Sequence, residues 1–202
     1  MYKPLIPTKA HVRAARGALL IALAGWSATP ALVQASPASE ARPPACPALL
    51  NHRFDRLQDE KPQDLCQYAG RVVLVVNTAS FCGFTGQYKA LEALHTRLRS
   101  RGLVVLGFPS NDFGRQEPGN NQAIADFCEN TFGVRFPMFT KSSVVGPDAN
   151  PLYRQLAART GQAPKWNFHK YLIDRSGQTV RSFPSSTQPD DPTFIREIEK
   201  IM

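Results

Sequence analysis

The chain has 202 residues, of which 43% are hydrophobic and 20% are charged, enough for one domain with a substantial core and without sign of a second domain. Four of the 24 basic residues and none of the 16 acidic residues precede Ser36, so the formal net charge of +8 falls to +4 beyond that point. This modest excess, scattered along the chain with no basic run interleaved with aromatic residues, argues against nucleic acid as a partner.

The first 35 residues have the organisation of an export signal. Basic residues precede an uncharged apolar run, and the segment ends in small residues that an export peptidase reads. We predict cleavage between Ala35 and Ser36 and export to a bacterial periplasm. A retained membrane anchor is the alternative, but Gly25 and Pro30 interrupt the apolar run, which is short for a membrane span. No stable membrane insertion is expected after cleavage.

Residues 36–48, rich in Ala, Pro and Ser, are typical of a flexible arm that leads into a folded domain over residues 49–202. An exported chain meets oxidising conditions, in which cysteines pair. Cys46 and Cys66 bracket a polar segment, and a disulfide between them would tie the arm to the chain just before the first core strand. Two free thiols are the alternative.

A strand, a turn and a helix start follow one another around Cys82. Residues 72–76 form a short, unbroken and mostly β-branched run, which predicts a strand covered on both faces. Residues 77–86 are small, polar and glycine-bearing, so the chain turns there. Apolar residues then recur at helical spacing over residues 88–100. We expect the free N–H groups of this helix start to point at the sulfur of Cys82 and to favour its thiolate form.

Helix and strand patterns alternate through the rest of the chain. The expected elements are a strand at 103–108, helices at 121–131 and 151–159, strands at 170–174 and 179–183, and a helix at 192–202. The strand at 72–76, the helix at 88–100 and the strand at 103–108 together imply a parallel crossover. The Asp-Arg-Ser-Gly between the last two strands predicts a hairpin. Residues 49–65 predict only a short hairpin or an irregular segment, and the polar loop 109–120 follows a strand end where function commonly lies.

A parallel crossover followed by a hairpin and a helix is the thioredoxin-like arrangement, an α/β fold with a central mixed sheet flanked by helices. Thioredoxins carry a second cysteine at the helix start, where this chain has Thr85. A lone cysteine cannot run dithiol exchange, so Cys82 is interpreted as a nucleophile that attacks something outside the protein. Inert packing is the plain alternative, but Cys82 stands in a turn beside Gly83 and outside the apolar run.

Five motifs stand in the order and spacing of one family over residues 65–202. They are Val-Asn-Thr-Ala-Ser-Phe-Cys-Gly-Phe-Thr (76–85), Gly-Phe-Pro-Ser-Asn-Asp-Phe-Gly-Arg-Gln-Glu-Pro-Gly (107–119), Phe-Pro-Met-Phe-Thr-Lys (136–141), Pro-Leu-Tyr (151–153) and Trp-Asn-Phe (166–168). Together they resemble the glutathione peroxidase family, here as a bacterial, cysteine-containing and exported member. The resemblance implies a thiol-dependent peroxidase domain over residues 49–202 that reduces hydrogen peroxide and organic hydroperoxides.

The same resemblance implies that Cys82 replaces the selenocysteine of many animal members and that Gln116, Trp166 and Asn167 are the other three catalytic residues. Taken singly, these three are an ordinary loop residue, a packing aromatic and a turn former. Their chemistry fits the role, because amide and indole N–H groups donate hydrogen bonds to a developing anion without carrying charge. The product at Cys82 would be a sulfenic acid, which a thiol reduces through a mixed disulfide, with no metal or bound cofactor.

The chain departs from the family pattern at positions that bear on the reductant. Ser110 stands where many members have cysteine, and Cys128 directly follows Phe127, whereas the expected pattern of a resolving cysteine is Phe-x-Cys. One step along a helix turns a side chain by about 100°. Since Ile124, Phe127 and Cys128 share an inward face, a structural role for Cys128 is favoured, and a resolving role is the alternative.

The expected partners are peroxide substrates and either glutathione or a thioredoxin-like protein as reductant, with Lys165 and Arg181 as candidates for binding glutathione. The short segment between Tyr153 and Trp166 lacks the insertion that tetrameric members use, which predicts a monomer. The alternative function is a peroxide sensor that passes oxidation to a partner protein by thiol-disulfide exchange. A binding module without activity would leave the four site residues unexplained.

Overall fold

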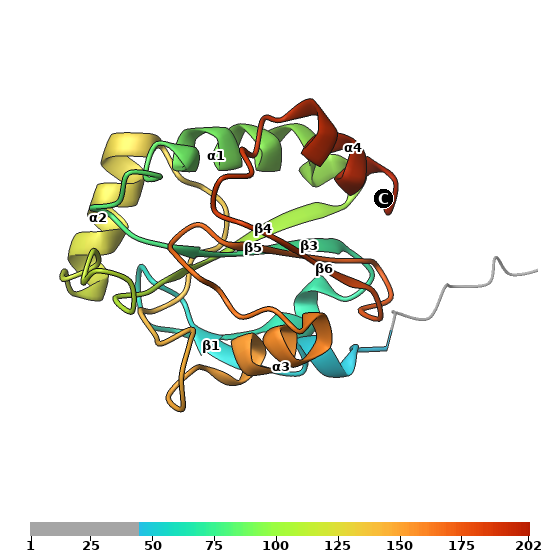
Figure 1. Ribbon diagram of the computed structural model, residues 1–202, viewed down its shortest axis with the longest axis horizontal. Helices are drawn as coiled ribbons and strands as arrows, with labels where there is room; N and C mark the ends of the chain where they lie inside the picture. Colours follow the sequence, from blue (N-terminus) through green and yellow to red (C-terminus); the bar gives the residue numbers. More distant parts are fainter. Residues whose placement is uncertain (1–44) are drawn as a thin grey trace, which may run out of the picture. The chain divides into compact units, whose positions relative to one another are not determined.

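The computed structural model describes residues 45–202. The predicted export signal, its cleavage site and most of the predicted arm lie outside the described residues. Within them, a four-stranded sheet carries helices on both faces (Figure 1). None of these helices has the length and apolarity needed to cross a bilayer.

The sheet has the order β4-β3-β5-β6 and is mixed, as predicted. Its strands are β3 (Val72–Thr78), β4 (Leu103–Pro109), β5 (Lys170–Ile173) and β6 (Val180–Phe183). β3 and β4 run parallel and are in register from Val72 opposite Leu103 to Thr78 opposite Pro109. β5 is antiparallel to both of its neighbours and forms the predicted hairpin with β6. The crossover and the hairpin confirm the thioredoxin-like fold.

The helices are α1 (Gln87–Leu98), α2 (Asn121–Phe132), α3 (Pro151–Thr160) and α4 (Pro192–Glu199), and a 3-10 turn, η3 (Arg99–Arg101), extends α1. Gly102 ends that segment in a left-handed conformation, with φ of 106°, which suits a residue without a Cβ. The last helix stops at Glu199, three residues earlier than predicted. The chain end is held instead by Arg175, whose Nε donates to the Met202 carbonyl across 2.5 Å.

Two apolar layers hold the helices to the sheet, and they follow the alternation of side chains along β3. Val72, Leu74 and Val76 face the layer formed with α1, α2 and α4, while Val73 and Val75 face the layer formed with α3. Both layers are closed to solvent, which explains why β3 and β4 read as continuous apolar runs.

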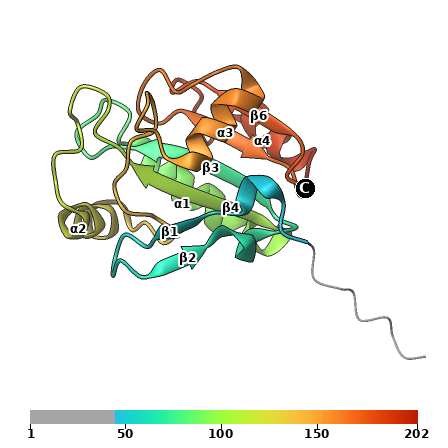
Figure 2. The same ribbon diagram turned by 90° about the horizontal axis from the view of Figure 1, so that it is seen from below.

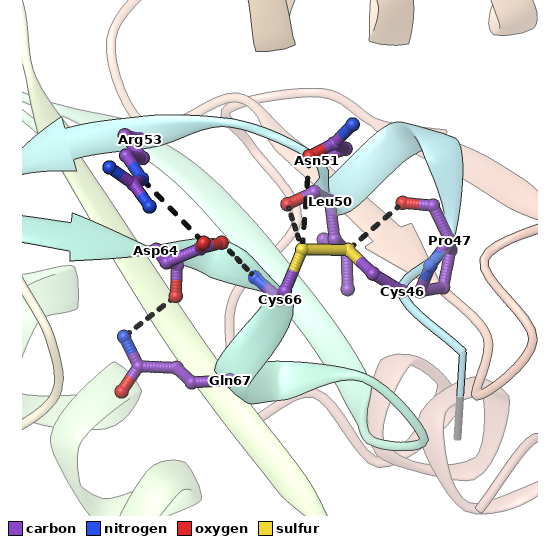
Figure 3. Close-up of a disulfide and its surroundings, with 8 residues drawn as sticks. All are labelled: Cys46, Pro47, Leu50, Asn51, Arg53, Asp64, Cys66 and Gln67. Atoms are coloured by element: carbon purple, nitrogen blue, oxygen red, sulfur yellow. Dashed lines mark hydrogen bonds and ion pairs between the residues drawn. A yellow bond between two sulfur atoms is a disulfide. The ribbon is translucent and has the colours of Figure 1, made fainter. Parts of the chain in front are cut away.

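A small hairpin lies on the same side of the sheet as α3, as the view from below shows (Figure 2). Its strands are β1 (Arg53–Asp55) and β2 (Pro62–Asp64), flanked by the 3-10 turns η1 (Ala48–Leu50) and η2 (Leu65–Tyr68). Cys46 and Cys66 form a disulfide with a Cα–Cα distance of 5.1 Å (Figure 3). This is the pairing that the sequence left open against two free thiols, and it ties the entry of the domain to η2.

Candidate active site

The three segments predicted to carry the site meet at one edge of the sheet. β3 and β4 are parallel, so the turn with Cys82 and the loop with Gln116 leave from the same edge. β5 runs the other way and begins opposite Val76, so Trp166 and Asn167, which precede it, arrive at that edge too. The topology therefore gathers residues that are far apart in the sequence.

Local hydrogen bonds fold the turn around Cys82. The Cys82 N–H donates to Thr85 Oγ1 across 2.9 Å, and this hydroxyl donates to the Ala79 carbonyl across 2.9 Å. The Phe84 N–H donates to Cys82 Sγ across 3.4 Å. Thr85, at the position of the second thioredoxin cysteine, thus has a structural role, while the partly exposed sulfur of Cys82 receives a backbone donor.

The helix start contributes differently from what the sequence suggested. The N–H groups of Gln87, Tyr88 and Lys89 donate to the carbonyls of residues 84–86 and do not point at the sulfur. The expectation that free helical N–H groups reach Cys82 is therefore wrong. The carbonyls of the turn before α1 accept these helical N–H groups. The donor to the sulfur is instead the Phe84 N–H, which lies inside that turn.

Gln116 is fastened to the Cys82 turn through its backbone. Its carbonyl accepts from the Phe81 N–H across 3.0 Å, so the residue before Cys82 and Gln116 are directly joined. The loop reaches this position through Gly114 and Arg115, which both have positive φ, at 62° and 52°. Its next residue, Glu117, is anchored by a bond from its N–H to Asn111 Oδ1 across 2.8 Å. The loop backbone that carries Gln116 is therefore held on both sides.

Asn167 is fully buried and completes the contact between the loops. Its Nδ2 donates to Gln116 Oε1 across 3.0 Å and to the Phe113 carbonyl across 3.5 Å. With its oxygen occupied, Gln116 retains Nε2 as a donor that makes no hydrogen bond within residues 45–202. The buried Asn167 thus orients the partly exposed Gln116 amide.

Trp166 lies at the surface of the same edge, with 39% of its area exposed. Its carbonyl accepts from Asn77 Nδ2 across 3.1 Å, and its ring centroid lies 5.9 Å from that of Phe113. The indole Nε1 makes no hydrogen bond to any described residue. Trp166 is thereby tied to the end of β3, where the Cys82 turn begins.

The structure therefore brings all four predicted residues to one edge and bonds Gln116 to Asn167. Within the described residues, none of the three predicted donor side chains is hydrogen-bonded to Cys82 Sγ. Sequence reasoning missed Asn77, a fully buried amide that holds the Trp166 carbonyl. A polar residue at the end of an apolar strand was the signal that could have identified it.

Cys128 lies on α2 with 2% of its area exposed. Burial, together with the nearby Glu117 carboxylate, raises the pKa of its thiol to about 11, although a hydrogen bond with Tyr88 acts the other way. The preceding residue, Phe127, stacks on Phe81 with ring centroids 6.3 Å apart. The residues that precede the two free cysteines are thus in contact across the gap between α2 and the Cys82 turn.

The two candidates for binding glutathione differ in their surroundings. Arg181 on β6 is ion-paired with Glu197 of α4, so its charge is already engaged. Lys165, directly before Trp166, is exposed and forms no ion pair with any described carboxylate. Of the two, Lys165 remains free to meet an anionic thiol.

Residues 52–157 match the family profile described as "Glutathione peroxidase". The chain is 50% identical over 137 residues to the glutathione peroxidase-like peroxiredoxin GPX5 of Chlamydomonas reinhardtii, covering 66% of this chain and 83% of that protein. It is 47% identical over 154 residues to the hydroperoxy fatty acid reductase gpx1 of Synechocystis, covering 71% and 90%. A third relative, the glutathione peroxidase-like peroxiredoxin gpx1 of Schizosaccharomyces pombe, is 43% identical over 160 residues, covering 76% of this chain and 100% of that protein.

Solved structures of similar proteins align with the chain as well. The crystal structure of T. cruzi GPX1 aligns with a TM-score of 0.60 at 30% identity, covering 76% of this chain and 95% of that chain. The structure of MTB dsbF aligns at 0.55 with 14% identity, covering 78% and 100%, and this likeness concerns the fold alone.

Proposed function

Because this chain belongs to the glutathione peroxidase family, we propose that Cys82 is its peroxidatic thiol and that Gln116, Trp166 and Asn167 complete its catalytic site. The family membership makes the protein a thiol peroxidase, an oxidoreductase that reduces peroxides. The observation that carries the assignment of residues is the contact between the loops: Gln116 accepts from Phe81 through its backbone and from Asn167 through its side chain.

In the first step, the Cys82 thiolate attacks one oxygen of the peroxide and forms an S–O bond while the O–O bond breaks. The sulfur is oxidised to a sulfenic acid, and the peroxide is reduced to water or an alcohol once the leaving oxygen takes up a proton. Negative charge thus moves from sulfur to the leaving oxygen. The site has to stabilise that charge at both places.

Neutral donors can do this without competing for the proton. The Phe84 N–H already donates to the sulfur. Gln116 Nε2 and Trp166 Nε1, unengaged by other described residues, are the donors for the leaving oxygen. Removing one such donor from an oxyanion site costs a factor of about 10² to 10³ in rate in other enzymes. Asn167 acts through Gln116 by holding the amide in one orientation.

The substrates proposed are hydrogen peroxide and organic hydroperoxides. The Synechocystis relative is named as a hydroperoxy fatty acid reductase, which supports an organic hydroperoxide among them. The two large apolar side chains exposed on the described residues, Phe81 and Trp166, suit an apolar peroxide, since one precedes Cys82 and the other lies at the same edge.

The second step returns Cys82 to the thiol. An attacking thiolate forms a disulfide with the sulfenic sulfur and releases water, and a second thiol then reduces that disulfide. The helical spacing favours a structural role for Cys128, and its burial is consistent with that role. We nevertheless propose the alternative, that Cys128 is the first attacker and that a thioredoxin-like protein is the final reductant. The Phe81–Phe127 contact favours this route, because it already holds the α2 segment against the Cys82 turn. Direct attack by glutathione is the alternative route.

A second candidate function uses the same disulfide differently. A peroxide sensor would transfer the oxidised state from Cys82 to a partner protein and would turn over slowly with small thiols. The exposed apolar surface beside Cys82 would suit such a partner. Rates with glutathione, with thioredoxin and with neither therefore separate a peroxidase from a sensor.

We propose that the protein is exported to a periplasm and acts there as a monomer. The support for export is the leader-like composition of the first 35 residues and a disulfide between Cys46 and Cys66, which fits an oxidising compartment. Edman sequencing of the exported chain would test the cleavage site, and an intact leader would contradict it.

The decisive test of function compares peroxide consumption by the wild type and by Cys82→Ser, with thioredoxin and glutathione supplied separately. We expect the variant to lose all protein-dependent consumption. A variant that replaces Cys46 and Cys66 by serine is the matched control, because it also loses cysteines but leaves the site intact. Equal rates for the wild type and Cys82→Ser would overturn the proposal.

A further inference from the structure

A lysine lies fully buried in the core beside the active site. Lys170 is the first residue of β5 and has no exposed area. It stands opposite Val76 of β3 and Phe183 of β6, so its side chain enters the apolar layer beneath α1. No described carboxylate forms an ion pair with it. A cation at such a place costs free energy that apolar packing would not, which calls for a compensating role.

Within residues 45–202, the Lys170 ammonium makes one hydrogen bond, and it goes to the segment that carries Trp166 and Asn167. Its Nζ donates to the carbonyl of Phe168 across 2.7 Å. Burial lowers the pKa of this lysine to about 7, so the bond is made by a group that is easily neutralised. The lysine thus reaches back by two residues to the segment just before β5, which also carries Asn167 and Trp166.

Phe168 is in a conformation that a phenylalanine rarely adopts. Its φ is 64°, in the left-handed region that costs energy for any residue with a Cβ. Its N–H donates to the Asn77 carbonyl across 2.6 Å, and its ring packs edge-on against Tyr88 with centroids 5.2 Å apart. With the Lys170 bond, the backbone and the ring of this residue are held from three directions.

The left-handed residue turns the chain between the core and the site. Phe168 is fully buried in the core, whereas the partly exposed Trp166 lies two residues earlier and Asn167 between them bonds Gln116. An extended backbone at Phe168 would carry Asn167 away from Gln116, because successive side chains of a strand point to opposite faces. The position of both site residues therefore depends on this one conformation.

We propose that Lys170 is a positioning residue of the peroxidase site, which holds the left-handed turn at Phe168 and thereby places Trp166 and Asn167 beside Gln116. This inference rests on the proposed function of those residues, although the placement itself can be measured without peroxide. A purely structural lysine would instead matter for the stability of β5 and leave the site loops unchanged.

The test uses two replacements in the full chain. Lys170→Met keeps the length and removes the donor, and Lys170→Arg keeps a cationic donor at the same place. Lys89→Met, the same change at an exposed position of α1, is the matched control. Stopped-flow mixing with peroxide measures oxidation of Cys82 in a single turnover, and circular dichroism measures unfolding.

Trp166 supplies an independent readout of placement. The chain contains only one other tryptophan, Trp26, so a Trp26→Phe background isolates its fluorescence. We expect Lys170→Met to remain folded, to oxidise at least tenfold more slowly than the wild type, and to raise the acrylamide quenching of the already partly exposed Trp166 above the wild-type level. We expect Lys170→Arg to recover most of the oxidation rate and the wild-type level of quenching, and Lys89→Met to behave as the wild type.

The proposal is overturned if folded Lys170→Met keeps the wild-type oxidation rate and quenching, or if Lys170→Arg recovers neither. Failure of both variants to fold would also overturn it, because Lys170 would then be a requirement of the core and not of the site. A wild type that consumes no peroxide would defeat the proposed function alone, since the quenching comparison does not depend on activity.

Discussion

The side-chain amide of Asn167 donates to the side-chain oxygen of Gln116 across 3.0 Å, joining residues 51 positions apart. Because an amide has one oxygen and one nitrogen, occupying the oxygen of Gln116 decides which end remains for a ligand. The end left over is a hydrogen-bond donor, which is what a departing peroxide oxygen requires. Through this bond, the buried Asn167 influences the reacting atoms although it does not contact them itself.

The first prediction concerns this pair. We expect Gln116→Ala to slow oxidation of Cys82 by about 10²-fold, as for the loss of one oxyanion donor. Asn167→Ala should slow it less, and the double variant should be little slower than Gln116→Ala, because Asn167 acts through Gln116. Stopped-flow rates with hydrogen peroxide for the four proteins form the double-mutant cycle.

Gln122→Ala, which removes an exposed glutamine of α2, is the control for this cycle and should keep the wild-type rate. Strictly multiplicative effects of the two replacements would show that Gln116 and Asn167 act independently. That result would contradict an orienting role for Asn167.

The second prediction follows from His169, which is buried and shares a 2.8 Å hydrogen bond between Nε2 and Ser182 Oγ. Burial, assisted by the charge of Lys170, lowers its pKa from 6.5 to about 4. Between these two values the unfolded chain holds the proton and the folded chain does not. The contribution to stability is therefore complete above about pH 6.5 and is lost as the pH falls toward 4.

We expect the free energy of unfolding to fall more steeply for the wild type than for His169→Gln when the pH is lowered from 7 to 4.5. The full difference in pKa corresponds to about 3 kcal/mol, so a relative change of about 2 kcal/mol is the expected order. Urea denaturation at both pH values measures it. Glu117, whose pKa burial raises, titrates in both proteins and cancels. If the free energy of unfolding depended on pH equally in the two proteins, His169 would not be the group responsible for the loss of stability.

The third prediction concerns the disulfide between Cys46 and Cys66, which closes a loop over a sequence separation of 20. Loss of a bridge of this span lowers the free energy of unfolding by about 3 kcal/mol, mainly through the unfolded chain. Replacing both cysteines by serine should lower the melting temperature by several degrees. Oxidation of Cys82 should stay within about twofold of the wild type, because the bridge lies outside the site.

Reducing the wild type with dithiothreitol should lower its melting temperature to that of the double serine variant. A double serine variant with the same melting temperature as the untreated wild type would show that the bridge adds no stability. A variant with a slowed first step would show instead that the entry of the domain is coupled to the active site.

Much of the fold could be predicted because short stretches of sequence determine individual helices, strands and turns. The apolar runs of β3 and β4, the helical spacing in α1 and the Asp-Arg-Ser-Gly turn before β6 each specify their element without tertiary information. The end of α4 could not be predicted in this way. Its apolar pattern continues to Ile201, but Arg175, distant in the sequence, binds the carbonyl of the last residue.

The sequence could predict which residues form the site but not which hydrogen bonds hold them together. The motifs named Gln116 and Asn167, yet no local pattern shows that one donates to the other or that Asn77 holds the carbonyl of Trp166. The donor to Cys82 Sγ was assigned to the helix start, whereas a turn amide supplies it. Such contacts depend on the register of distant strands, which periodicity does not fix.

The last prediction addresses how Cys82 is regenerated. After one equivalent of peroxide, we expect non-reducing peptide mapping to find a disulfide between Cys82 and Cys128. Cys128 is buried, so α2 has to unwind locally for the two sulfurs to meet. Of the 12 residues of α2, Ile124, Ala125 and Cys128 are buried, so local unwinding of this helix exposes few core side chains.

Opening of α2 also changes the reactivity of Cys128. The burial that raises the pKa of its thiol to about 11 is removed when the helix unwinds, so the thiolate becomes more accessible as it approaches Cys82. We therefore expect faster hydrogen exchange of the α2 amides in the oxidised protein. Cys128→Ser should keep the wild-type rate of Cys82 oxidation but lose at least tenfold in turnover with thioredoxin, because its sulfenic acid has no internal partner. A wild type in which the sulfenic acid or a glutathione adduct persists, with no disulfide to Cys128, would instead assign Cys128 to the core of α2 and regeneration to an external thiol.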